Sequence, residues 1–222
     1  QGLVYTNQLR HASKNCGAYL IIDNGVTEIG NAMPLSELIS SAKKVAANEI
    51  VLPDKFGHSA LTREYVRNAI RAIDGIGGIP YQCMAVLHCD GIQDLIDTLG
   101  EWADYPEIKV IGIPKRQTVS EWWSFGRISI LRAMELRGYH VRFNVHMLGV
   151  WEDMRETYMI AHEFPWVRSI DTSWPVMAGL HGIDIEEHPK TKIHYVPHPE
   201  NLWDVDMVLR NIQTYRRWAR GE

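Results

Sequence analysis

Short apolar runs alternate with stretches of helical periodicity along almost the whole chain. The runs are three to six residues long and rich in apolar and β-branched residues, which is typical of buried strands. They fall at residues 3–5, 18–22, 49–52, 82–87, 109–113, 140–145, 167–170 and 192–196. Between most of them, apolar residues recur every three or four positions, which predicts helices at 34–47, 61–73, 92–99, 118–138, 152–163 and 202–218.

This alternation of strand and helix predicts an α/β fold with a parallel sheet covered by helices. A closed (β/α)8 barrel and an open doubly wound sheet both fit the pattern. We favour the barrel, because seven or eight strand candidates are present in 222 residues and no linker or repeat interrupts them. The prediction is one compact (β/α)8 barrel of the TIM type, a single domain over residues 1–222.

Composition narrows the class of protein further. The chain is 45% hydrophobic and 23% charged, which excludes global disorder. No apolar segment approaches the roughly 20 residues that span a bilayer, so we expect no membrane partner. Three scattered cysteines and the lack of a signal-peptide pattern predict a cytoplasmic protein. A net charge of −4 argues against extensive coating of nucleic acid but allows a local basic groove.

Polar side chains close the predicted strands, where the active site of a barrel enzyme lies. These strand-end residues are Asp23, Asp54, His88, Lys115, His146 and Asp171. One aspartate after a strand is more often a turn former or a helix N-cap than a catalyst. Aspartates at three different strand ends together favour an enzyme that uses paired carboxylates.

Basic and glycine-rich segments are weaker candidates for phosphate binding. The segment 75–80 is rich in glycine but precedes a strand, so we interpret it as a helix-to-strand loop. Lys115 and Arg116 lie on the predicted active rim and are the better phosphate candidates. The arginines of the last helix are interpreted as a solvated face, with contact to a nucleic-acid backbone as the alternative; they are Arg216, Arg217 and Arg220.

The histidines near the end of the sequence do not have the spacing of a zinc site. They are His181, His188, His194 and His198, and no cysteine follows Cys89. A structural zinc site is normally closed by four such ligands at short, regular spacing. We therefore expect no metal in this chain.

Five groups of residues at these strand ends carry a resemblance to a known family. They are Ile21-Ile-Asp23-Asn-Gly25, Glu49-Ile-Val-Leu-Pro-Asp54, Val86-Leu-His88-Cys-Asp-Gly91, Val110-Ile-Gly112-Ile-Pro-Lys115, and His146-Met-Leu-Gly149-Val150 followed by Ser169-Ile-Asp171-Thr-Ser-Trp-Pro175. Their order resembles the tRNA-guanine transglycosylase superfamily and is most similar to short phage relatives that put 7-deazaguanines into DNA. The resemblance covers roughly residues 19–180.

The resemblance implies a base-exchange reaction with defined catalytic residues. Asp171 would be the nucleophile that attacks C1′ and expels guanine, which leaves a covalent glycosyl-aspartate. Asp23 would be the general acid/base that takes a proton from the incoming deazaguanine. The base pocket would be formed by Asp54, His88, Gly112 and Leu148, of which Leu148 stands at the family's stacking methionine.

The resemblance also implies the partners of the reaction. The incoming base would be a 7-deazaguanine such as preQ0, and Lys115 and Arg116 would contact the nucleic-acid backbone. DNA is expected rather than tRNA, because the chain carries no additional RNA-binding domain. The family's cysteine-rich zinc motif is missing, so we expect neither zinc nor another cofactor. A homodimer or a partner protein is the expected assembly, in the host cytoplasm if a phage encodes the chain.

Two other functions fit the same residues. One is a barrel lyase or hydrolase that acts on a small phosphorylated substrate held by Lys115 and Arg116. The other is a non-catalytic barrel that serves as a binding module. The presence of Asp23, Asp54 and Asp171 together argues against the binding module, which would be expected to have lost at least one of them.

Overall fold

The computed structural model describes residues 11, 14–15, 17–26, 30–115, 126–150, 154–189 and 204–221. The strands expected at 3–5 and 192–196 lie outside these ranges. The chain divides into two compact units, Gln1–Asn144 and Val145–Glu222, here called the first and the second unit. The interpretation of residues 1–222 as one domain stays a prediction, and each unit is described by itself.

Over the residues that the structure describes, the first unit is built on four parallel strands that follow one another in chain order. They are β1 (Ile21–Ile22), β2 (Glu49–Val51), β3 (Gln82–Val86) and β4 (Ile108–Pro114). β2 is buried throughout and β4 is buried except at Lys109. Burial on both faces is the normal state of a parallel strand covered by helices, and it explains why these strands have continuous apolar runs.

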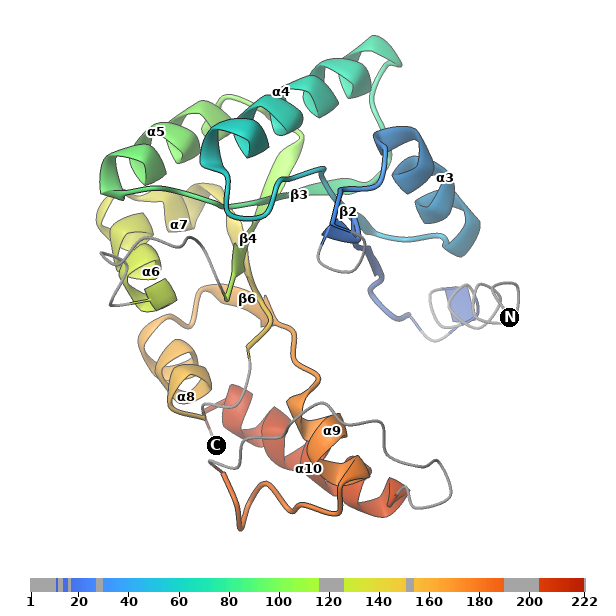
Figure 1. Ribbon diagram of the computed structural model, residues 1–222, viewed down its shortest axis with the longest axis vertical. Coiled ribbons are helices and arrows are strands. Elements are labelled where there is room, and N and C mark those ends of the chain that lie inside the picture. The colour runs from blue at the N-terminus through green and yellow to red at the C-terminus, as the bar shows by residue number, and fades with distance from the viewer. Residues whose placement is uncertain are drawn as a thin grey trace. The chain divides into compact units, whose positions relative to one another are not determined.

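Amphipathic helices accompany these strands. They are α3 (Leu35–Val45), α4 (Ser59–Gly75), α5 (Ile92–Ala103), α6 (Gly126–Leu136) and the single turn α7 (Tyr139–Arg142). Figure 1 shows α4 and α5 side by side. Glu101 of α5 joins them, because its two carboxylate oxygens accept hydrogen bonds from Arg63 at 2.8 Å and from Arg67 at 2.9 Å. Burial raises the pKa of Glu101, but these two bonds outweigh it and leave the pKa below its ordinary value.

In its described residues, the second unit combines a parallel strand pair with three helices. The strands are β5 (Asn144–Leu148) and β6 (Val167–Ile170), and the helices are α8 (Met154–Glu163), α9 (Trp174–Leu180) and α10 (Val205–Ala219). α9 and α10 lie side by side (Figure 1) and share a core of Trp174, Ala178, Ile185 and Tyr215. The buried Asn211 fixes their spacing, since its amide donates to the carbonyl oxygens of Pro175 and Ile183.

The prediction of a closed eight-stranded barrel is wrong. The described residues contain six strands, which follow the chain order and pair in parallel, so the α/β class is correct and the closed barrel is not. The run at 140–145 explains part of the error: its first residues belong to the helical turn α7, and the strand begins only at Asn144. Of the run at 18–22, only Ile21–Ile22 is a strand.

Within the described ranges, no helix combines the length and the apolar character that crossing a bilayer requires.

Candidate functional site

A buried polar network lies just beyond the carboxyl ends of β2 and β3. Asp54 and His88 are each 1% exposed, and the His88 Nε2 atom lies 2.7 Å from Asp54 Oδ2. The second carboxylate oxygen, Oδ1, accepts a hydrogen bond of 2.6 Å from the amide of Asn24, which follows β1. Three strand ends thus contribute one side chain each, and the sequence-predicted pair Asp54 and His88 is in direct contact.

The backbone beyond the strands sets this network in place. Sheet pairing continues past β2 and β3, because Leu52 N–H donates to Met84 and Leu87 N–H donates to Gly112, both at 2.8 Å. Asn24 is held from both sides: its amide also donates to the Leu52 carbonyl, and its oxygen accepts the N–H of Val26. The network is therefore ordered by the sheet.

The network retains hydrogen-bonding capacity for a ligand. A carboxylate only accepts hydrogen bonds and has about four lone-pair sites, so Asp54 as a carboxylate can take further donors besides His88 Nε2–H and the Asn24 amide. The other ring nitrogen of His88, Nδ1, is buried and has no hydrogen-bond partner among the described residues. An unsatisfied buried polar atom costs about 1–3 kcal/mol, which a ligand N–H facing Nδ1 would remove. Phe56 packs edge-on against the imidazole at a centroid distance of 5.8 Å.

The other predicted residues of the first unit lie around the same strand ends. Asp23 is exposed, and its Oδ1 accepts the backbone N–H of Asn24 at 2.9 Å. Gly112 is buried inside β4, and its carbonyl is occupied by sheet pairing. Lys115 is exposed and directly follows β4, whereas Arg116 lies outside the described residues.

The first unit also contains a cavity and two buried cysteines. This cavity of about 360 Å³ has Pro53 and Lys55 in its lining but not Asp54. Burial raises the pKa of the Cys83 thiol to about 12 and raises that of Cys89 as well. Neither cysteine has the lowered pKa that a catalytic thiol requires.

Asp171 belongs to the second unit, where it directly follows β6 and is exposed. Its backbone completes the β5–β6 pairing. The Asp171 N–H donates to the Met147 carbonyl at 3.0 Å, and the Asp171 carbonyl accepts from the Val150 N–H at 2.9 Å. The carboxylate accepts the backbone N–H of Gly149, which has a φ of 62°, a left-handed conformation that favours glycine. Leu148, the predicted stacking residue, is half-buried at the end of β5.

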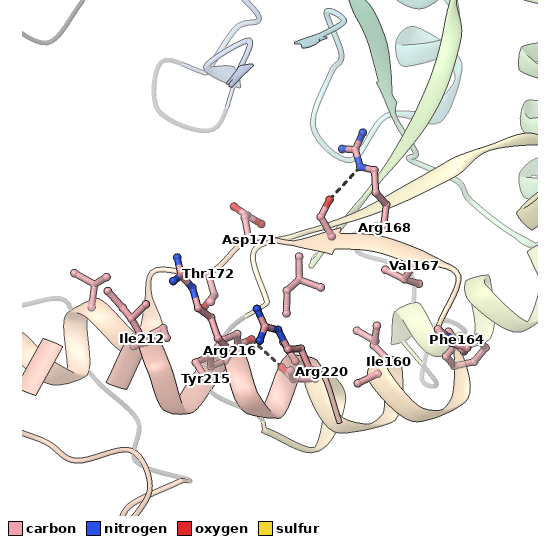
Figure 2. A pocket seen from close by; sticks show the side chains of 18 residues that line it. Ile160, Phe164, Val167, Arg168, Asp171, Thr172, Ile212, Tyr215, Arg216 and Arg220 are labelled. Carbon is pink, nitrogen blue, oxygen red and sulfur yellow. Dashed lines mark hydrogen bonds between the residues drawn. The ribbon is translucent and has the colours of Figure 1, made fainter. Parts of the chain in front are cut away.

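A pocket of about 790 Å³ opens beside Asp171 within the second unit. Its apolar lining comes from α8, β6 and α10, and includes Ile160, Ile170 and Ile212. Three arginines and Asp171 supply the charged part of its lining, as Figure 2 shows. The arginines are Arg168, Arg216 and Arg220.

The sequence did not indicate several of these contributors. Asn24 joins Asp23 to Asp54, and its position directly after the strand-end Asp23 could have indicated this role. The backbone N–H of Gly149 holds Asp171, and no side-chain pattern could reveal it. Arg216 and Arg220 line the pocket instead of forming only a solvated face; their spacing of four residues on a helix could have indicated a shared direction.

Metal ligands do not gather in the part of the chain that is described. No three histidine, cysteine, aspartate or glutamate side chains there lie close enough to hold an ion. His194 and His198 lie outside the described residues.

Comparison with models of known protein families finds no match to this sequence, and comparison with curated proteins finds none either.

Proposed function

We propose that this chain is a base-exchange transglycosylase that replaces guanine in a polynucleotide with a 7-deazaguanine. The observation that carries the proposal is the buried pair of Asp54 and His88, closed by Asn24 at the strand ends. Guanine-type bases present adjacent N–H donors at N1 and the 2-amino group. The Asp54 carboxylate and the unpartnered Nδ1 of His88 are acceptors that suit such an edge.

Asp171 is the nucleophile of the proposed reaction. Its carboxylate oxygen forms a bond to C1′ while the bond from C1′ to N9 breaks, and guanine leaves with a proton that the carboxyl group of Asp23 donates to N9, which leaves Asp23 as a carboxylate. The hydrogen bond from the Gly149 N–H orients the carboxylate before attack. The product of this step is an ester between Asp171 and the sugar.

Asp23 is the general acid/base of the second step. It takes the N9 proton of the incoming 7-deazaguanine, whose N9 then attacks C1′ and breaks the ester to regenerate Asp171. Two displacements at C1′ retain the anomeric configuration. Asp23 is exposed, and its Oδ1 accepts the backbone N–H of Asn24, which orients the carboxylate for proton transfer.

DNA is the polymer in this proposal, on the basis of the resemblance to the short phage relatives. A base within a duplex must be extruded before C1′ is accessible, at an expense of about a few kcal/mol.

An incorporation assay tests the proposal. The protein is incubated with guanine-containing duplex DNA or with tRNA, together with labelled guanine or labelled preQ0, and label in the polymer is counted. We expect label in DNA, with loss of at least about a thousandfold in Asp171→Asn and a smaller loss in Asp23→Asn.

Exposed aspartates provide matched controls for these two variants. Asp206→Asn in α10 and Asp74→Asn in α4 remove a carboxylate from each unit outside the proposed site and should retain activity. Absence of label from every polymer would contradict the proposed function. Label that survives Asp171→Asn would contradict the assignment of the nucleophile, and label confined to tRNA would contradict the choice of DNA.

A further inference from the structure

The pocket beside Asp171 has the opposite charge to the chain as a whole. Three guanidinium groups and one carboxylate line it, so its lining carries a net charge of +2, whereas the chain carries −4. Its volume of about 790 Å³ falls within the range of roughly 300–1,000 Å³ typical of ligand sites. A positively lined, half-apolar cavity in an acidic protein indicates a ligand with both an anionic and an apolar part.

Arg216 and Arg220 are the groups best suited to hold the anion. They are four residues apart on α10, so their side chains leave the helix on one face, and Figure 2 shows both on the side of the pocket. Neither guanidinium makes a hydrogen bond or ion pair with another described residue. Arg217, by contrast, forms an ion pair with Glu186 at 3.0 Å.

The remaining lining fits a sugar or a base better than a second charge. Ile160, Ile170 and Ile212 supply apolar surface, and Thr172 adds a hydroxyl next to Asp171. Arg168 lies on the same lining and donates from Nε to the hydroxyl of Ser169 at 3.2 Å. The Asp171 carboxylate repels an anion close to it, which directs a phosphate toward α10.

We infer that this pocket binds the phosphate groups of the strand that carries the target nucleotide, through Arg216 and Arg220. Guanidinium groups match phosphate oxygens with two parallel hydrogen bonds, and the apolar lining receives the adjoining sugar or base. The inference rests on the proposed function for the identity of the strand. In this inference the principal contacts to the nucleic-acid backbone are two arginines next to the proposed nucleophile, in place of Lys115 and Arg116, which the sequence predicts.

Salt-dependent binding of DNA tests the inference without requiring catalysis. The probe is a fluorescein-labelled single strand of about 12 nucleotides that contains no guanine, and its anisotropy is measured over a series of KCl concentrations. Each phosphate contact to a single strand contributes about 0.7 to the slope of log K against log [salt]. We expect the double variant Arg216→Gln with Arg220→Gln to lose about 1.4 from this slope and to bind roughly a hundredfold more weakly at low salt.

Two further variants separate charge from structure. Arg210→Gln removes a cation from the same helix outside the pocket and should leave the slope unchanged. Arg216→Lys with Arg220→Lys keeps both charges and should recover most of the slope, with weaker binding because lysine lacks the two-pronged geometry. Thermal unfolding of every variant accompanies the titrations. If the glutamine pair does not fold, the single variants Arg216→Gln and Arg220→Gln carry the test, each with an expected loss of about 0.7 from the slope.

Three outcomes would overturn the inference. The first is a slope in the glutamine pair equal to that of Arg210→Gln. The second is a slope in the lysine pair equal to that of the glutamine pair, which would mean that charge is not what the pocket supplies. The third is binding of inorganic phosphate that depends on both arginines with no change in the DNA slope, which would assign the pocket to a small phosphorylated molecule.

Failure of the proposed function has a different signature. Absence of base exchange with the expected loss of slope would leave a strand-binding site without the transglycosylase. Base exchange with an unchanged slope would leave the transglycosylase without this site.

Discussion

Replacing Asp54 with leucine should destabilise the first unit strongly. The side chain of Asp54 is only 2% exposed, and its two oxygens accept from His88 Nε2 at 2.7 Å and from the Asn24 amide at 2.6 Å. Leucine accepts neither bond, so two buried donors lose their acceptor, and its larger side chain adds a packing cost in the same direction. At about 1–3 kcal/mol for each donor, the free energy of unfolding should fall by about 2–6 kcal/mol.

Hydrogen exchange followed by mass spectrometry measures this loss within the first unit. The amides of β2 and β3 should exchange from about 30-fold to about 20,000-fold faster in Asp54→Leu, since each 1.4 kcal/mol is a factor of ten. Combining Asp54→Leu with His88→Leu removes both members of the pair. The double variant should be more stable than the sum of the two single losses predicts, by about 1–3 kcal/mol.

The exposed Asp74 provides the control for this experiment. Asp74→Leu removes a carboxylate at the end of α4 and should leave β2 and β3 exchange within about threefold of the unmodified chain. Exchange in Asp54→Leu that is equally close to the unmodified chain would refute the reasoning. In that case the buried pair would not stabilise the strand ends, and its role as a preorganised base-binding group would lose its physical basis.

Three further predictions concern packing, a thiol and a carboxylate. Gly179→Ala should lower the melting temperature, because a Cβ there would meet the backbone of Val208 inside contact distance, whereas Gly75→Ala meets nothing; calorimetry compares the two. Cys83 should resist iodoacetamide in the folded chain at pH 8, because burial raises its pKa to about 12, and rapid labelling would contradict this. The pKa of Glu101 is lowered from its ordinary value of 4.5, so its contribution to the free energy of unfolding is present above pH 4.5 and is lost as the pH falls below that value. Glu101→Gln should therefore reduce the fall in stability at acid pH, measured by denaturant unfolding over a series of pH values.

The helices could be predicted from the sequence more accurately than the strands. The pattern at 61–73 predicts a helix, and the structure has α4 at Ser59–Gly75, two residues longer at each end. An apolar stripe that recurs with helical periodicity over four turns is compatible with few structures other than a helix. A short apolar run is ambiguous, and Val141 illustrates this. It belongs to a predicted strand, yet it lies in the turn α7 with its side chain 83% exposed.

The helix α9 was not predicted at all. Pro175 lies in its first turn, a common position for proline in a helix, but the residues around it were interpreted only as a motif after Asp171. A seven-residue helix has too few periods to stand out from a sequence. Its existence depends on packing against α10, which is tertiary information.

The candidate site also contains some residues that the sequence predicts and others that only the tertiary structure reveals. That Asp54 and His88 follow neighbouring strands was readable from the sequence, and parallel pairing explains why they meet. That Asn24 completes the network was not readable, because the contact joins residues 30 positions apart. The direction of Arg216 into a pocket depends on the rotation of α10 about its axis, which the sequence alone does not specify.

Trapping of the covalent intermediate tests the central claim most directly. A guanine-containing oligonucleotide is incubated with the protein without an incoming base, quenched in acid, and the protein is separated under denaturing conditions and digested for mass spectrometry. The account predicts an oligonucleotide joined to the peptide that contains Asp171, absent from Asp171→Asn and retained in Asp206→Asn. Release of guanine with no adduct, or an adduct on a different residue, would contradict it.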